Sequence, residues 1–281
     1  MLQSSASSRQ AAAQAARARV SSAVVTPGGG LPAGAVIQVF AHGLNAQPER
    51  GHLFYVGGFD RPLSCIGLQI PQGQLGRLLE AARIGDAVSI GTRGLSLARA
   101  GRPVLRLGWE EPERIDLSFA HVLSSEQLPR AARAIREADP RLAPGLAPGR
   151  DLERALRGLQ SEGPAQEAAA FWLLGRGLGL TPSGDDILMG FGAGLLAAGE
   201  RGAFASFSRA LESVLSRRST TAVSEAYLSA MLSGSLNEGM LAFLEAAYAG
   251  ADLAAPLARA RDYGHSSGDD MLLGLCTAFE R

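Results

Sequence analysis

The spacing of apolar residues changes once along the chain, and this change limits the possible folds more than any other feature. Up to about residue 120, apolar residues stand in short runs separated by Gly, Pro, Asn and Asp, as in β-strands. From residue 151 onward, Ala, Leu, Glu and Arg recur with helical spacing. A Pro- and Gly-rich segment at 139–150 separates the two patterns. The sequence therefore predicts an α+β protein, in which an N-terminal antiparallel β-barrel or sandwich precedes a C-terminal helical bundle.

We divide the 281 residues into three segments. Residues 1–30 are predicted to be a flexible N-terminal segment, residues 31–145 a β-rich domain, and residues 146–281 a helical domain. Residues 1–20 are mostly Ala, Ser, Gln and Arg, which bury little surface, so a frayed tail is favoured over a short amphipathic helix. They lack the continuous apolar core of a secretory signal, and no stretch of about 18 apolar residues occurs. We therefore expect a cytoplasmic protein.

Short apolar runs mark the expected strands of the β-rich domain. They read AVIQVFAHG, HLFYVGG, LSCIGLQI, DAVSIGT, LSLARAG, VLRLG and RIDLSFA. One helical insert is expected around 74–83, and the GRP sequence at 101–103 predicts a hairpin turn. The amphipathic segment 125–138 is predicted to be a helix that precedes the domain boundary.

One helix of the second half is expected to lie at its centre. The segment 187–198 is apolar on nearly all sides and contains Gly190, Gly192 and Gly194. Glycine inside a helix costs up to about 1 kcal/mol relative to alanine. We therefore expect neighbouring helices to approach this segment closely.

The chain contains no lysine, so all 27 basic residues are arginines, and they balance 27 acidic residues. Schiff-base, Walker-type and general-base lysines are thereby excluded, and a bound anion must be held by arginine, hydroxyls, backbone N–H groups or a metal. The zero net charge argues against a nucleic-acid partner, whose phosphates require a basic surface.

The cysteines and histidines predict neither a disulfide nor a zinc site. Cys65 and Cys276 each lie in an apolar run, as buried thiols do. No two of the four histidines stand at metal-ligand spacing, so no metal ligand is assigned. Mg²⁺ held by aspartates is the one cofactor that we consider.

The most specific feature is a repeated phrase, TPSGDDILMG at 181–190 and HSSGDDMLLG at 265–274. Each copy predicts a helix start with Ser183 or Ser267 as the N-cap, and Gly184 or Gly268 allowing close backbone approach. Capping alone would explain one such copy, because acids in a first turn stabilise a helix by about 0.3–1 kcal/mol. The repetition and the Gly-rich approach GRGLGLTP instead favour a functional site, with both copies in one cavity.

Two kinds of ligand fit such a site. Backbone N–H groups and hydroxyls would bind an anion, whereas up to four carboxylates would bind a divalent cation that bridges to an anionic substrate. Direct anion binding requires the carboxylates to face other partners, because ionised Asp repels phosphate. The candidate catalytic residues are Asp185, Asp186, Asp270 and His265. His265 would act as a proton shuttle, or it is an exposed loop residue without a role.

A third cluster, RRSTTAVSEAYL at 217–228, combines arginines with hydroxyls before a helix. A guanidinium beside hydroxyls suits an oxyanion, although an ordinary Ser or Thr cap explains the same residues. In the first half, Asn45 is a candidate ligand, although an asparagine at such a position by default forms a turn. His42 is expected only to form a turn. The residues assigned to substrate or phosphate binding are Thr181, Ser183, Gly184, Ser267, Gly268, Arg218, Thr220, Thr221, Ser224 and Asn45.

At GRGLGLTPSGDDILMG the sequence resembles a bacterial domain-of-unknown-function family associated with the third subunit of the oxamate carbamoyltransferase of allantoin breakdown. VFAHGLN, DRPLS, GLTPSGDD, STTAVSEAYL and GHSSGDDMLLGL carry the likeness over most of the chain, and GLTPSGDD is the most specific. The family often has an aromatic residue where Asp269 stands, so the resemblance points to Asp270.

The resemblance implies a carbamoyltransferase subunit of purine catabolism that converts oxalurate and phosphate to oxamate and carbamoyl phosphate, or uses a related ureido acid. It implies a small anionic substrate and further subunits as partners, with no nucleic acid or membrane. Two other classes remain open: an Asp- and Mg²⁺-dependent hydrolase, and a non-catalytic scaffold subunit whose motifs only cap helices.

Overall fold

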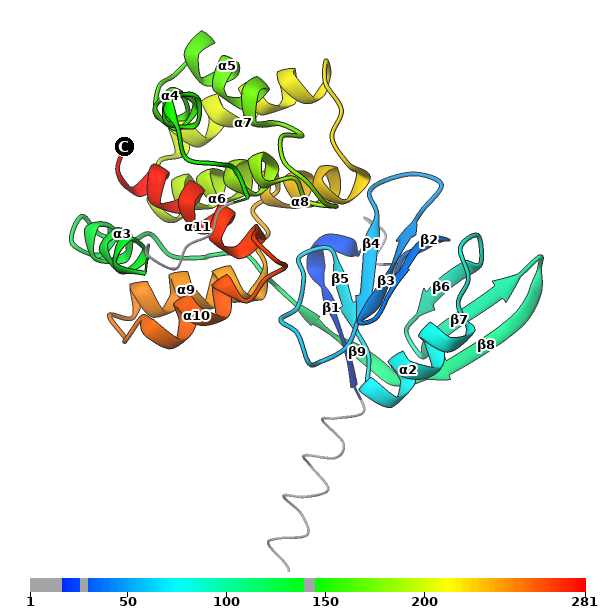
Figure 1. Ribbon diagram of the computed structural model, residues 1–281. Helices are drawn as coiled ribbons and strands as arrows, with labels where there is room; N and C mark the ends of the chain where they lie inside the picture. Colours follow the sequence, from blue (N-terminus) through cyan, green and yellow to red (C-terminus); the bar gives the residue numbers. More distant parts are fainter. Residues whose placement is uncertain (1–16, 26–29, 139–144) are drawn as a thin grey trace, which may run out of the picture. The chain divides into compact units, whose positions relative to one another are not determined.

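The computed structural model describes residues 17–25, 30–138 and 145–281 (Figure 1). The chain divides into two compact units, Met1–Leu117 and Ser118–Arg281. The first contains a β-sheet and the second contains helices, so the predicted α+β class is confirmed.

Nine strands of the first unit form one mixed sheet in the order β8-β7-β6-β2-β3-β4-β5-β1-β9. The strands are β1 (Arg17–Ser21), β2 (Ala33–Phe40), β3 (Gly43–Gln47), β4 (Phe54–Gly57), β5 (Gly67–Gln69), β6 (Ala87–Gly91), β7 (Gly94–Arg99), β8 (Arg102–Gly108) and β9 (Glu110–Ile115). A short 3₁₀ turn, η1 (Ser22–Val24), follows β1, and one helix, α2 (Gln72–Ala81), lies between β5 and β6. The expected helical insert and the hairpin between β7 and β8 are confirmed.

The predicted antiparallel barrel or sandwich is wrong. Two of the strand pairs, β4 with β5 and β1 with β9, are parallel, and among the described strands β8 and β9 end the order without pairing to each other. The sheet is therefore open and mixed. Short apolar runs indicate where strands lie but not which strands they pair with, because backbone pairing is decided by chain geometry far from each run.

Strand β1 lies within the segment 1–30, for which the sequence predicts a flexible chain. It pairs antiparallel with β5 and parallel with β9, and its alanine and valine at positions 18 and 20 are fully buried. Residues 1–16 and 26–29 lie outside the described residues. The short RARVS strand was missed because Ala and Arg are weak strand formers and only its position between two strands buries it.

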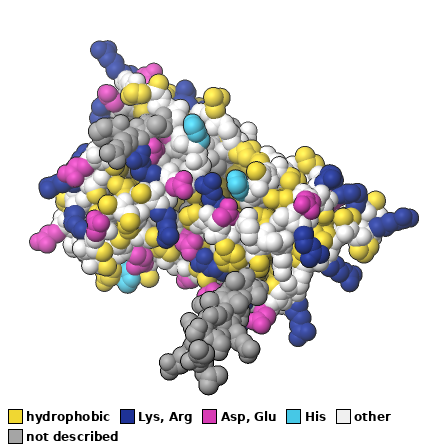
Figure 2. Space-filling view, turned by 60° about the horizontal axis from the view of Figure 1, so that its bottom comes forward, with side chains coloured by type: hydrophobic (Ala, Val, Ile, Leu, Met, Phe, Trp, Pro, Cys, Tyr) yellow, Lys and Arg dark blue, Asp and Glu magenta, His cyan; other side chains and the backbone are white. Residues whose placement is uncertain are grey.

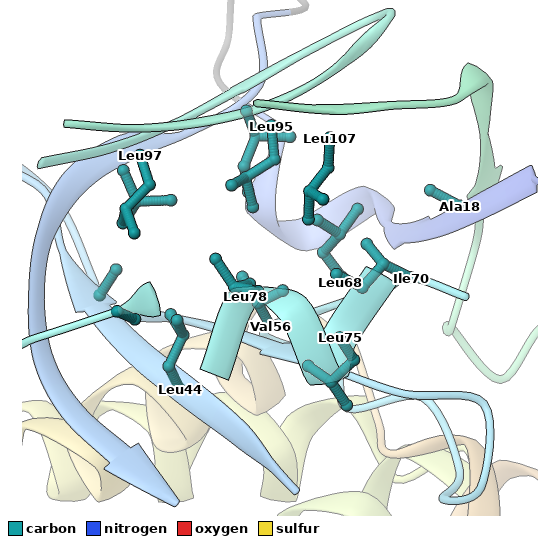
Figure 3. Close-up of a cluster of buried hydrophobic side chains, with 14 of the residues drawn as sticks. Ala18, Leu44, Val56, Leu68, Ile70, Leu75, Leu78, Leu95, Leu97 and Leu107 are labelled. Carbon is teal, nitrogen blue, oxygen red and sulfur yellow. The ribbon is translucent and has the colours of Figure 1, made fainter. Parts of the chain in front are cut away.

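The core of the first unit lies against one face of the sheet, which gives the strands the same alternating pattern of apolar residues that a barrel or sandwich would have. Side chains alternate between buried and exposed along β6 and β7, as expected for strands with one face against a core. Figure 3 shows Leu97 and Leu107 of β7 and β8 opposite Leu44 of β3, with Leu75 and Leu78 of α2 among them. One face of the sheet and one helix thus share a single apolar cluster.

The second unit consists of α3 (Gln127–Glu137), α4 (Arg150–Leu159), α5 (Pro164–Leu173), α6 (Ser183–Ala197), α7 (Arg201–Leu215), α8 (Ala222–Leu232), α9 (Glu238–Tyr248), α10 (Ala254–Arg261) and α11 (Ser267–Phe279). It begins earlier than the predicted boundary between residues 145 and 146, because α3 packs against α9, α10 and α11. The Pro- and Gly-rich segment therefore connects two helices of one unit.

Helices α6 and α11 lie side by side at the centre of this unit (Figure 1). Fourteen of the 15 residues of α6 are buried, as the apolar run predicts. A Cβ atom on Gly190 would lie 1.8 Å from the carbonyl oxygen of Met271, and one on Gly274 would lie 2.0 Å from that of Ile187. The two glycines stand at the same place in the two SGDD repeats, so the contact is made twice in the same way.

The surface has mixed charge. Figure 2 shows arginine and acidic side chains interspersed over much of the face displayed. None of the helices among the described residues combines the length and the apolarity that crossing a bilayer requires.

We expect Gly190→Ala and Gly274→Ala each to destabilise the protein by about 1–3 kcal/mol, as overpacked cores do. The added methyl group would meet a backbone carbonyl, which moves only if the helices separate, and this cost exceeds the gain of about 1 kcal/mol in helix propensity. Urea denaturation followed by circular dichroism at 222 nm measures the effect. In Gly202→Ala the new Cβ has no atom within 4 Å, so stability should stay unchanged or rise. Equal stabilities for all three variants would show that the crossing is loose.

Candidate functional site

The two SGDD motifs begin α6 and α11, but their serines are not N-caps. Ser183 and Ser267 are the first helical residues, and Pro182 and Ser266 stand at the caps without a side-chain capping bond. The expectation that these serines cap their own helices is wrong. Their hydroxyls are instead free to contact the neighbouring helix.

The glycines of the motifs make close approaches, as expected, but their N–H groups already have partners. Gly184 N–H donates to the carbonyl of Arg176 over 2.8 Å, and Gly268 N–H donates to that of Tyr263 over 2.9 Å. An anion held on these two N–H groups would have to replace loop carbonyls. The helix starts alone therefore do not form the predicted anion site.

The side chains of the two motifs meet across the helix pair. Ser183 lies beside Asp270, and Ser267 lies beside Asp186, so each serine faces the aspartate of the other copy. The hydroxyl oxygens of Thr181 and Ser267 are 2.9 Å apart. We call these five residues the Ser–Asp cluster. The structure thus brings the two motifs together at one buried place.

The adjacent aspartates of each motif point to different partners, because successive residues of a helix are rotated by about 100°. Asp185 accepts hydrogen bonds from Gly175 N–H over 2.6 Å and from the Thr220 hydroxyl. Asp269 forms an ion pair with Arg261, with 2.7 Å between Nε and Oδ1. Asp185 and Asp269, which we call the outer aspartates, therefore lie outside the Ser–Asp cluster. Asp186 and Asp270, which we call the inner aspartates, belong to it.

This division bears on the possible metal site. The sequence allows up to four carboxylates in one cavity, whereas the structure places two of them elsewhere. Within residues 17–25, 30–138 and 145–281, no group of three or more His, Cys, Asp or Glu side chains could hold a metal ion. Two carboxylates and hydroxyls remain as the oxygen ligands of the cluster.

Burial raises the pKa of Asp186 well above its usual value, and the charges of Asp270 and Asp185 raise it further. The hydroxyls of Ser267 and Thr181 oppose this rise. The Asp186 side chain is 1% exposed, and its Oδ2 atom has no hydrogen-bond partner among the described residues. The site therefore favours the neutral acid, or a ligand that donates hydrogen bonds to the anion.

Burial also raises the pKa of Asp270. Ser183, the N–H of Gly145 and Ser266 oppose the rise, and the charge of Asp269 adds to it. Gly145 N–H donates to Asp270 Oδ1 over 3.0 Å, while Asp270 Oδ2 lacks a partner among the described residues. Both inner aspartates thus keep one buried acceptor atom without a donor.

The cluster at 217–228 forms a helix start next to the first motif. Thr221 caps α8, since its hydroxyl accepts from Ser224 N–H over 3.0 Å and donates to the carbonyl of Leu180. Arg218 donates to the carbonyl of Phe171 over 2.9 Å and lies over its ring, 5.2 Å from the centroid. The capping interpretation is confirmed for Thr221, and Ser224 is buried in the first turn.

The same cluster acts on the outer aspartate of the first motif. Burial raises the pKa of Asp185, and the N–H of Gly175, the Thr220 hydroxyl and the charge of Arg218 lower it. Thr220 and Arg218 are therefore linked electrostatically to the start of α6. This link supports treating 217–228 as part of the candidate site.

Two further predicted site residues are not among the five residues of the Ser–Asp cluster. Asn45 is in strand β3 of the first unit rather than in a turn, and its Nδ2 atom donates to Gln38 Oε1 over 2.8 Å. His265 is exposed in the turn before α11. His42 does lie in a turn, between β2 and β3, and its carbonyl accepts from Tyr55.

Sequence reasoning missed residues that complete the surroundings of the motifs. Gly145 comes from the Pro- and Gly-rich segment that the sequence marks only as a boundary, yet a Cβ on it would lie 2.0 Å from Ser183 Oγ. Arg176 lies over the ring of Trp172, 4.0 Å from its centroid. Arg176 stands inside the GRGLGLTP loop and could have been chosen, whereas nothing local distinguishes Gly145.

One protein family matches part of the second unit. Residues 173–279 match the family model described as oxamate carbamoyltransferase subunit AllH. The match confirms the resemblance expected from the motifs, and it includes both SGDD copies and the 217–228 cluster. The AllH match begins at the last residue of α5 and ends with α11. Searches of curated proteins and of solved structures gave no match.

We expect Asp186→Asn to flatten the dependence of stability on pH. An acid whose pKa is raised by folding holds its proton in the folded state while the unfolded chain releases it, so the free energy of unfolding falls as the pH rises above about 4 and stops falling beyond the raised pKa. Asn does not ionise, so this loss of stability is absent in the variant. The free energy of unfolding of the variant minus that of the wild type should therefore be larger at pH 7 than at pH 4.

Urea denaturation at pH 4, 5.5 and 7 measures the dependence. Asp252→Asn, at an exposed position between α9 and α10, is the control and should follow the wild type. A variant Asp186→Asn with an unchanged slope would show that the buried carboxyl ionises without cost.

Proposed function

We propose that the protein is a carbamoyltransferase subunit acting on a ureido acid, with the second unit binding a small anionic substrate. The observation that carries this proposal is the AllH family match across both SGDD motifs, whose side chains form one buried cluster. The proposal places the protein in the cytoplasm and in purine catabolism, with other subunits of the same system as partners. The buried thiols of Cys65 and Cys276 are consistent with a reducing compartment.

The proposed reaction converts oxalurate and phosphate to oxamate and carbamoyl phosphate. An oxygen of phosphate attacks the ureido carbonyl carbon, a C–O bond forms, and the bond from that carbon to the oxamate nitrogen breaks. The proton of monohydrogen phosphate ends on the oxamate nitrogen. No oxidant, reductant or covalent enzyme intermediate is needed, so positioning and charge stabilisation are the main tasks of the site.

The phosphate end of the substrate is assigned to Arg218 beside the start of α6. A guanidinium has five N–H donors, and the hydrogen bond from Arg218 to the carbonyl of Phe171 uses one of them. The positive end of the α6 dipole adds to the attraction. The hydrogen bonds that Asp185 accepts from Gly175 and Thr220 offset part of its negative charge. The absence of lysine from the sequence leaves arginine as the fixed cation.

We expect Arg218→Lys to weaken binding of carbamoyl phosphate and of phosphate by about 1.5–3 kcal/mol, the range for hydrogen bonds to charged groups. Lysine keeps the charge but loses the planar fork and the stacking on Phe171. Isothermal titration calorimetry in EDTA measures the change.

Arg201→Lys is the matched control, because Arg201 lies at the exposed start of α7 outside every motif, and it should bind as the wild type does. Equal small effects of both variants would place the anion site elsewhere. Binding only with added Mg²⁺ would favour the metal-dependent hydrolase, and no binding at all would favour the scaffold subunit.

A further inference from the structure

Two buried acceptor atoms in the second unit have no donor among the described residues: Oδ2 of Asp186 and Oδ2 of Asp270. The two side chains are 1% and 0% exposed. A buried carboxylate oxygen without a hydrogen bond is costly and therefore needs an explanation, and a ligand that supplies the missing donor is one. Neither atom has a part in the phosphate contact assigned to Arg218.

The surroundings of these atoms are rich in oxygen and poor in positive charge. The hydroxyls of Ser183, Ser267 and Thr181 lie within the same cluster. The arginines near the motifs are directed to the outer acids, since Arg261 pairs with Asp269 and Arg218 faces Asp185. The inner pair of carboxyls is therefore left without a cationic partner among the described residues.

These features select the chemistry of the missing group. A phosphate or carboxylate brings oxygen acceptors in place of the missing N–H donors, and an ionised inner aspartate would repel it. A methyl group would leave both acceptor atoms unsatisfied. A primary amide nitrogen is neutral and carries two N–H donors, so it can serve acceptors on two sides at once. The –CO–NH₂ end of a carbamoyl compound has this form, and its other end is the anion.

We propose that Asp186 and Asp270 recognise the –NH₂ of the transferred carbamoyl group through their Oδ2 atoms. This inference rests on the proposed function and adds the residues that distinguish a carbamoyl group from other acyl groups of the same shape. The serines hold the two carboxyls in place, each from the opposite motif. The repeat therefore supplies one acceptor from each of its copies.

The test compares carbamoyl phosphate with acetyl phosphate, in which a methyl group replaces –NH₂. Isothermal titration of the full chain in EDTA should show at least about tenfold tighter binding of carbamoyl phosphate, because a site built for N–H donors discriminates against the analogue that lacks them. Asp186→Asn and Asp270→Asn should each reduce this preference to within about threefold. The ratio of the two affinities is the readout, because any change in the local charge affects both phosphates alike.

The control variant is Asp252→Asn, which should keep the preference of the wild type. Equal binding of the two phosphates by the wild type would overturn this inference and leave the proposed function intact, without any need for the variants to fold. A preference that persists in both cluster variants, or that appears only with Mg²⁺, would also overturn it. Binding of neither compound, with inorganic phosphate also silent, would instead overturn the proposed function and this inference together.

Discussion

The contact of two glycines with two carbonyls sets the distance between α6 and α11, and the rest of the second unit depends on it. Gly190 lies against Met271 and Gly274 against Ile187, where no side chain would fit. Because the glycines are equivalent in the two repeats, the helix starts that precede them are brought together as well. A repeated local phrase thereby produces a pair of helices related by approximate symmetry.

The same approach removes the motif side chains from water. Taken alone, an aspartate in a first turn is exposed and supports its own helix dipole. In the pair, each inner aspartate is buried against the other motif, and burial raises its pKa. The serines compensate in part by facing the aspartate of the opposite copy. Helix capping alone does not require the two buried acceptor atoms that lack donors among the described residues.

The outer aspartates show how one rotation along a helix separates two roles. Asp185 and Asp269 precede the inner residues by a single position in each motif, yet they contact Thr220 and Arg261 instead of the cluster. The arginines are thereby kept beside the site without neutralising its inner carboxyls. In the proposed site, Arg218 supplies donors to an anion and the inner pair supplies acceptors to a neutral N–H group. Carbamoyl phosphate has two such ends, an anionic phosphate and a neutral –NH₂.

The sequence by itself determined the α+β class, the position of most helices, the central place of α6 and the importance of the two SGDD copies. These follow from spacing, glycine content and repetition, which act over a few turns of chain. The sequence did not determine that the sheet is open and mixed, that β1 enters it, or that Ser183 and Ser267 face aspartates rather than cap helices. It also did not determine that Asn45 lies in strand β3 rather than in a turn. Gly145 and the partition of inner from outer aspartates came only from the tertiary structure, because contacts between residues far apart in the chain depend on how helices and strands pack, and no local pattern encodes that packing.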